Sequence, residues 1–172
     1  MPDYRVRRSK STENLPEIIE LLADAVAGVN LATRRRILHS ATRGQRLLLG
    51  YYFYWDDVTN GGHRQYFWNY TGSLWPEALE ATQVLGLAKE ERILRDALAL
   101  FPDKQPALTQ SARRAQLAKI TSTKASASAV LMASPTKFDK LDDRFIDLPG
   151  GDKAVRRYID KHPDEFFLPR RS

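Results

Sequence analysis

The chain has 172 residues, 27 of them Lys or Arg and 21 Asp or Glu, so its formal net charge is +6. This length suits one compact domain, and 42% apolar residues with three Trp, seven Tyr and seven Phe exclude global disorder. The absence of cysteine excludes disulfides, a thiol nucleophile and Cys-ligated metal sites. The longest uncharged apolar run, residues 47–55, is shorter than the roughly 20 residues of a membrane-spanning helix, so we expect a cytoplasmic protein that does not bind membranes.

Residues 1–13 are basic and have no apolar stretch behind their charges, so they lack the core of a secretory signal. We expect a flexible arm that is either a solvated tail or a contact to nucleic acid. A helix over 16–30 follows, because apolar residues recur there at spacings of three and four. Its expected buried stripe is Ile18, Leu21, Leu22, Ala25, Val26 and Val29.

A second short segment, 33–39, contains Arg34, Arg35 and Arg36, which cannot all be buried. Residues 42–58 then predict the central core helix, because they are apolar around most of the helix circumference. A strand over 47–55 is the alternative, since Tyr, Phe and Trp favour sheets. Residues 60–62, Asn-Gly-Gly, interrupt this helix before a compact aromatic segment over 63–70, and Gly72 is a candidate helix cap.

Further helices are expected where Pro and Gly mark the ends of apolar patterns. Pro76 and Gly86 bound one helix, residues 89–101 form the next before Pro102, and the two make a helical hairpin. Residues 103–134 are rich in Ser, Thr, Ala and Lys and are interpreted as an insertion, with a helix over 110–120 and a loop or weak helix over 121–128.

The last two expected helices begin after Pro135 and at Asp152. The first carries Phe138, Leu141, Phe145 and Ile146, and the second ends before Pro163. The sequence thus predicts an all-α fold: a compact multi-helix single domain over 14–168 with short connections bounded by Gly and Pro.

The three histidines have no metal-ligand spacing, so no metal site or cofactor is expected. One polar cluster, Asp56, Asp57, Asn60 and His63, surrounds the glycine turn. It either satisfies helix-end and turn amides or forms the site of a small hydrolase. No phosphate-binding loop or nucleophile elbow is present, so we expect no catalysis.

Charge is unevenly distributed along the chain. Residues 51–100 have four basic and seven acidic side chains, whereas the arm, the Arg34–Arg36 triplet, the insertion and the tail carry the positive excess. A nucleic-acid-binding protein would gather such residues on one face. The candidate contacts are Arg34, Arg35, Arg36, Arg113 and Arg114. The aromatic residues lie in apolar segments, which favours the core over a stacking platform for bases.

Residues 58–69 read Val-Thr-Asn-Gly-Gly-His-Arg-Gln-Tyr-Phe-Trp-Asn and are followed by Gly72 and the Ala-Leu-Ala-Leu-Phe-Pro of 97–102. With residues 138–145 and 158–166, they resemble a bacterial domain family of unknown function whose named member is a DNA-mimic protein. His63 stands where the family has an aromatic residue. The matching hallmark residues are Asn60, Gly61, Gly62, Gln65, Tyr66, Phe67, Asn69 and Gly72.

The resemblance implies an all-helical, non-catalytic module that binds a partner protein in a regulatory or immunity role, with carboxylates imitating DNA phosphates. The charge of +6 is opposite to that of a whole-molecule mimic, so only a local acidic face fits. Candidates for that face are Asp56, Asp57, Glu77 and Glu80. For the hallmark we expect a structural role: the glycines make the turn, Asn60 and Asn69 bond backbone, and residues 65–67 pack on the core helix.

Overall fold

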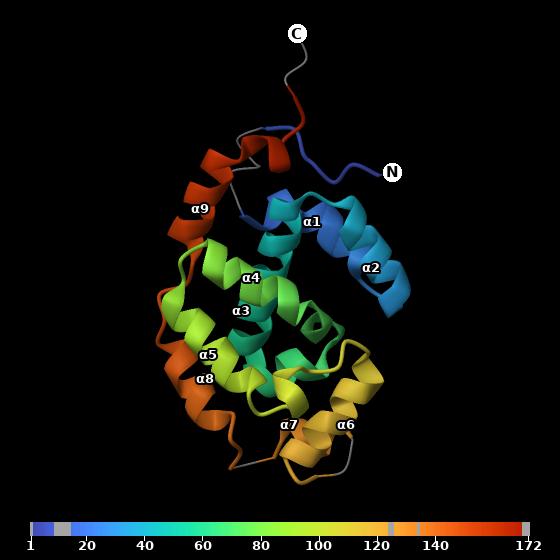
Figure 1. The fold of residues 1–172 in the computed structure, drawn as a ribbon, viewed down its shortest axis with the longest axis vertical. Coiled ribbons are helices and arrows are strands. Elements are labelled where there is room, and N and C mark those ends of the chain that lie inside the picture. Colours follow the sequence, from blue (N-terminus) through green and yellow to red (C-terminus); the bar gives the residue numbers. More distant parts are fainter. Residues whose placement is uncertain (1, 9–14, 124–125, 134, 170–172) are drawn as a thin grey trace. The chain divides into compact units, whose positions relative to one another are not determined.

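The structure is a computed structural model that describes residues 2–8, 15–123, 126–133 and 135–169 (Figure 1). Its helices are α1 (Leu15–Val26), α2 (Leu31–Ser40), α3 (Arg43–Trp68), α4 (Trp75–Val84), α5 (Ala88–Leu98), α6 (Gln110–Ile120), α7 (Ala127–Leu131), α8 (Asp139–Ile146) and α9 (Asp152–Lys161). The residues described contain one isolated β-bridge and no longer strand, so the predicted all-α fold is confirmed. None of the helices in these ranges is long and apolar enough to span a membrane.

The chain divides into two compact units, and α3 begins in one and ends in the other. The terminal unit comprises Met1–Leu49 and Gly151–Ser172, and the central unit comprises Gly50–Gly150. By sequence, the terminal unit has 15 Lys or Arg against nine Asp or Glu, and the central unit has twelve of each. The whole net charge of +6 therefore belongs to the terminal unit.

In the terminal unit, α1 packs against α2 and α9 and buries Ile18, Ile19, Leu22 and Val26. The predicted extension of this helix to residue 30 is wrong, because the chain turns at Gly28, whose φ is +66°. Asn30 is the N-cap of α2: its side chain accepts a hydrogen bond from the backbone N–H of Thr33 at 2.9 Å. Leu21, expected in the buried stripe, is 50% exposed.

The N-terminal segment, residues 2–8, lies along the end of the chain. The backbone N–H of Val6 donates to Phe166 O, and the N–H of Leu168 donates to Val6 O, both at 2.9 Å. The sequence predicts a flexible arm over 1–13, but in the structure Val6 is paired with the end of the chain through a single β-bridge, because an extended backbone can satisfy its polar groups on a distant segment. Met1 and residues 9–13 lie outside the described residues.

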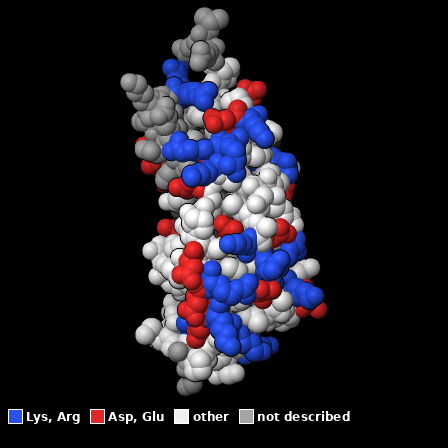
Figure 2. All heavy atoms as spheres, turned by 90° about the vertical axis from the view of Figure 1, so that its left-hand side faces the viewer, with Lys and Arg blue, Asp and Glu red and all other residues white. Residues whose placement is uncertain are grey.

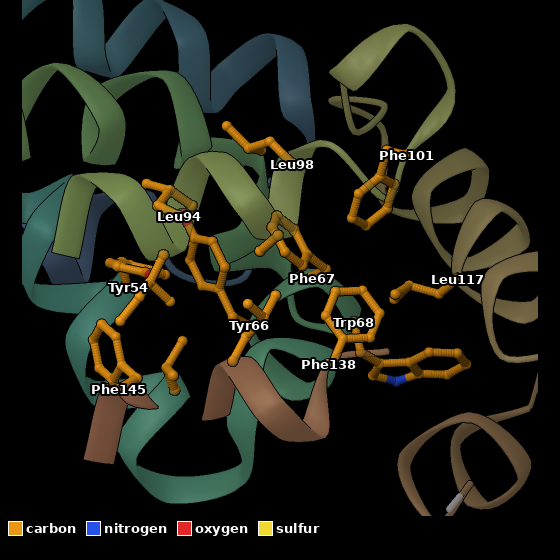
Figure 3. Packing of buried hydrophobic residues seen from close by; sticks show 14 of the residues in the cluster. Tyr54, Tyr66, Phe67, Trp68, Leu94, Leu98, Phe101, Leu117, Phe138 and Phe145 are labelled. Atoms are coloured by element: carbon orange, nitrogen blue, oxygen red, sulfur yellow. The ribbon is translucent and has the colours of Figure 1, made fainter. Parts of the chain in front are cut away.

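The central unit is built around an aromatic core (Figure 3). Side chains of α3, α5, α6 and the segment around α8 converge there, and the rings of Tyr54 and Phe145 pack edge to face at 5.1 Å between centroids. The predicted core helix is confirmed and the strand alternative for 47–55 is wrong. The insertion is also part of the core, because Leu117, Ala118 and Val130 are buried in the same cluster.

The remaining helices of this unit follow the predicted Pro and Gly signals. Pro76 lies in the first turn of α4, Gly86 takes a φ of +71° after it, and α4 packs against α5 as the predicted hairpin requires. Helix α6 has the predicted bounds. Gly72 is not a cap of an α-helix but a buried residue of a 3-10 turn over Tyr70–Leu74.

Candidate functional site

The hallmark segment begins at a break in α3. Gly61 and Gly62 leave the helical conformation, and Gly62 has a φ of +76°, which an L side chain adopts only with strain. The space that a Cβ would need at Gly62 is filled by the carboxylate of Asp142 from α8. The two glycines therefore make the turn, as predicted; the Gln65 side chain fills the space at Gly61, and the carboxylate of Asp142, distant in sequence, fills the space at Gly62.

Asp57 organises the polar side of the segment. Its buried carboxylate accepts hydrogen bonds from Asn69 Nδ2 at 2.6 Å, from Gln65 Nε2 at 3.3 Å and from the hydroxyl of Thr71. The Asn60 side chain donates to Asp56 Oδ1 at 3.2 Å. The expectation that the Asn60 and Asn69 side chains bond backbone is therefore wrong. Each amide bonds a carboxylate instead, Asp56 one helical turn before Asn60 and Asp57 twelve residues before Asn69, because an ionised carboxylate is a stronger acceptor than a carbonyl.

His63 connects the turn to α8 and to the core. Its Nδ1 lies 2.5 Å from Asp142 Oδ1, and its backbone N–H donates to the same oxygen at 2.9 Å. Its Nε2 lies 3.0 Å from the hydroxyl of Tyr54. Both aromatic side chains are fully buried, and burial raises the pKa of Tyr54 well above its ordinary value. This Asp-His-Tyr series resembles a catalytic relay, but solvent and substrate do not reach its Tyr hydroxyl.

Arg113 of α6 closes the other end of the hallmark segment. Its guanidinium donates to the carbonyls of Phe67 at 2.7 Å, Asn69 at 2.6 Å, Ala107 at 2.8 Å and Leu108 at 3.0 Å. The side chain is fully buried. A Cβ at Gly72 would lie 2.9 Å from Arg113 Nε, so the glycine lets the guanidinium reach these carbonyls.

The five arginines proposed as nucleic-acid contacts differ in position. Arg34 and Arg113 are buried and bond backbone carbonyls, Arg34 through Val26 O at 3.2 Å, so neither presents its charge at the surface. Arg114 lies over the ring of Trp68 at 4.3 Å, and partial burial lowers its pKa. Arg35 is half-buried, and Arg36 is exposed. The sequence did not reveal that Arg34 and Arg113 are buried, because charge alone does not show which arginine will bind the backbone carbonyls of a turn.

The proposed acidic face of Asp56, Asp57, Glu77 and Glu80 is not a continuous exposed set. Asp57 is buried in the network described above, and Glu77 packs against Gly50 of α3, where a Cβ would lie 2.7 Å from Glu77 Cβ. Asp56 and Glu80 are exposed. The four carboxylates therefore do not form one exposed face.

A different acidic surface lies on α8. We define the α8 edge as Asp139, Asp143, Ile146 and Asp147. Asp143 and Asp147 are exposed, and Ile146, predicted to be buried, is 61% exposed. Figure 2 shows the face over α5 and α8, where a row of Asp and Glu runs beside a band of Lys and Arg. The sequence signal for this edge was the spacing of three aspartates at intervals of four residues.

Asp139 is held within the edge by its neighbours. Burial raises its pKa, but hydrogen bonds from the hydroxyl and backbone N–H of Thr136 and the charge of Arg64 outweigh this effect, so the pKa is lower than usual. The Thr136 hydroxyl lies 2.6 Å from Asp139 Oδ1, and Arg64 lies 3.4 Å from the same carboxylate. The carboxylate is therefore ionised at neutral pH.

The cluster proposed for hydrolysis is split between separate networks. Asp57 bonds Gln65, Asn69 and Thr71, whereas His63 bonds Asp142 and Tyr54. This arrangement supplies no accessible nucleophile beside a base. Among the residues that the structure describes, no three His, Asp or Glu side chains are grouped as metal ligands.

Comparison with known proteins supplies one assignment. Residues 39–162, which include the hallmark segment, its partner Asp142 and all of α9, match the family model described as DMP19-like protein, where DMP stands for DNA mimic protein. No curated protein and no solved structure matches the chain. The chain therefore belongs to the DMP19-like protein family.

Proposed function

We propose that this protein is a non-catalytic module that binds a partner protein, and that the partner itself binds nucleic acid. Membership of the DMP19-like family supports the class of partner, because a DNA mimic competes for the surface that DNA would occupy. The split of the Asp56, Asp57 and His63 cluster supports the absence of catalysis. A regulatory or immunity role in the bacterial cytoplasm is the corresponding biological setting.

The observation that carries the proposal is the α8 edge. Its aspartates recur every four residues, which places successive carboxylates about 6 Å apart along the helix axis. Ile146, 61% exposed, lies between Asp143 and Asp147 and supplies an apolar contact within the acidic row. A basic nucleic-acid-binding cleft is attracted by such a row, and an apolar side chain adds buried area once contact is made.

Only part of the molecule takes part in this mimicry. The central unit has no net charge and the terminal unit has +6, so long-range attraction to a basic partner is absent. We therefore expect recognition at short range, through the α8 edge rather than through the overall field of the protein.

The test compares two charge-matched variants of the full chain. Asp143→Asn/Asp147→Asn alters the α8 edge, and Asp56→Asn/Glu80→Gln removes two exposed carboxylates of the face predicted from sequence. Partners captured from native cells by the wild type are identified by mass spectrometry, purified and titrated against each variant. We expect the α8 variant to weaken binding about tenfold and the control to change it less than about twofold.

The nature of the partner is a separate readout. Duplex DNA added to the preformed complex should displace this protein, because both ligands would occupy the same basic surface. Equal affinity of the two variants refutes the role of the α8 edge. A partner that binds no nucleic acid refutes the assigned partner class.

A further inference from the structure

The terminal unit carries a basic surface that the proposed function does not use. It is formed by α9 and by the N-terminal segment, residues 2–8. We define the α9 basic row as Lys153, Arg156, Arg157 and Lys161, all of them exposed. The upper part of Figure 2 shows several Lys and Arg close together, with some Asp and Glu among them.

Helix α9 separates its two faces cleanly. Ala154, Val155, Tyr158 and Ile159 are buried, and the opposite, exposed face carries the four residues of the basic row together with Asp152 and Asp160. Lys153, Arg157 and Lys161 recur every four residues and span about 12 Å along the helix axis. In the part of the chain that the structure describes, no hydrogen bond or ion pair engages any of the four basic side chains of this row. Their charge is therefore available to a ligand.

The N-terminal segment extends this surface. Its backbone pairing with Phe166 and Leu168 fixes Arg7 and Arg8, which are exposed, next to the end of α9. Arg8 lies over the Phe167 ring at 5.0 Å and 3.9 Å from Asp160 of α9. The arginines are thus held beside the basic row rather than carried on a loose tail, which lowers the entropy lost when a ligand binds.

We propose that this surface binds the phosphate backbone of double-stranded DNA without reading its sequence. The excess of positive charge confined to this unit complements the duplex. Binding to single strands relies on exposed aromatic rings, whereas Tyr158, Phe166 and Phe167 are buried here. An amphipathic membrane-surface helix needs an apolar face to insert, and the apolar face of α9 is packed inside the unit.

The surface gives the protein two separate contacts: the α8 edge for a nucleic-acid-binding partner and the α9 basic row for the duplex. A molecule with both contacts is concentrated on the DNA where its partner works. The two contacts are tested separately, because the experiment below contains no partner protein.

The experiment is a fluorescence anisotropy titration of the purified full chain against a 20-base-pair duplex at several salt concentrations. Lys153→Gln/Arg157→Gln alters the α9 basic row. Arg92→Gln/Lys140→Gln removes one Arg and one Lys, both exposed, from α5 and α8 of the central unit and leaves the same net charge. Thermal unfolding confirms that both variants fold.

Four phosphate contacts predict a slope of about −3.6 for the logarithm of the binding constant against the logarithm of salt, or about 150-fold weaker binding at 200 mM than at 50 mM salt. We expect the α9 variant to reduce this slope by about 2 and the control to leave it within about 0.5 of the wild type. Equal losses in the two variants overturn the proposal, because binding then depends on net charge alone. Tighter binding to a single strand or to phosphatidylserine vesicles than to the duplex also overturns it, as does no measurable binding at 50 mM salt.

Discussion

Removal of the Arg113 guanidinium is the sharpest test of how the hallmark segment is held. The side chain donates to four carbonyls, two within the segment and two in the loop before α6. Arg113→Met keeps a long apolar side chain but leaves these carbonyls without a donor. Hydrogen bonds to charged groups contribute about 1.5–3 kcal/mol each, and an unsatisfied buried group costs about 1–3 kcal/mol.

Two effects make the destabilisation smaller than the sum of these contributions. The variant no longer buries a charge, and the carbonyls at the loop are partly buried, so water replaces some donors. We therefore expect a net loss of roughly 3–5 kcal/mol in the free energy of unfolding. For a chain of this size each kcal/mol lowers the melting temperature by about 2–4 °C, so a decrease of about 10 °C is expected.

The matched control is Arg114→Met, one residue along the same helix. Arg114 donates to a single carbonyl, Trp68 O at 3.0 Å, and lies over the Trp68 ring, so its loss should cost about 1 kcal/mol. Circular dichroism at 222 nm during heating measures the melting temperatures of both variants. If Arg113→Met and Arg114→Met unfold at the same temperature, the carbonyls do not depend on Arg113 and the reasoning fails.

Three further predictions test the turn, the carboxylate network and the α8 edge. Gly62→Ala should lower the free energy of unfolding, measured in urea, by several kcal/mol, because the new side chain meets both an unfavourable positive φ and the carboxylate that fills its space. Gly86→Ala should lower it by about 1 kcal/mol, because Gly86 also has a positive φ but has open space around it. Similar losses in the two variants would contradict this reasoning. Asp57→Asn should lower the free energy of unfolding by roughly 2–4 kcal/mol, and Asp56→Asn, at an exposed position, should lower it by less than about 1 kcal/mol. The reverse order would show that the buried carboxylate of Asp57 does not hold the segment together. Because folding lowers the pKa of Asp139, its ionised carboxylate stabilises the folded protein at pH values above the pKa of the unfolded chain, and this stabilisation is lost as the pH falls through the folded pKa. Asp139→Asn should therefore lower the free energy of unfolding at pH 7 and have a smaller effect in acid. An effect that does not depend on pH would refute the assignment.

Local signals predicted most of the helices. Pro76 and Pro102 begin or end helices because they lack a backbone donor and fix φ, and Gly86 ends α4 because it adopts a positive φ freely. The bounds of α6 were predicted at both ends. The first helix was predicted too long, since the apolar pattern continues through Val29 after the chain has turned at Gly28.

Residues at the site were harder to assign, because their partners are distant in sequence. Arg113 bonds Phe67 O across 46 residues, and His63 bonds Asp142 across 79. A pattern of charge marks an arginine as a surface residue on average, but a guanidinium with five donors is stable inside a protein when carbonyls surround it. Ile146 was misplaced for the related reason that helical spacing does not tell which neighbour covers a face.

The sequence by itself determined the all-α class, most of the breaks in the helices and the hallmark that places the chain in its family, because these depend on residue type and near neighbours. The tertiary structure decided which polar side chains are used internally: Asp57, His63, Asp142 and Arg113 serve the fold. It also showed that the net positive charge of the chain lies in the terminal unit. Hydrogen bonds and burial depend on distances between segments, and only the folded chain sets those distances.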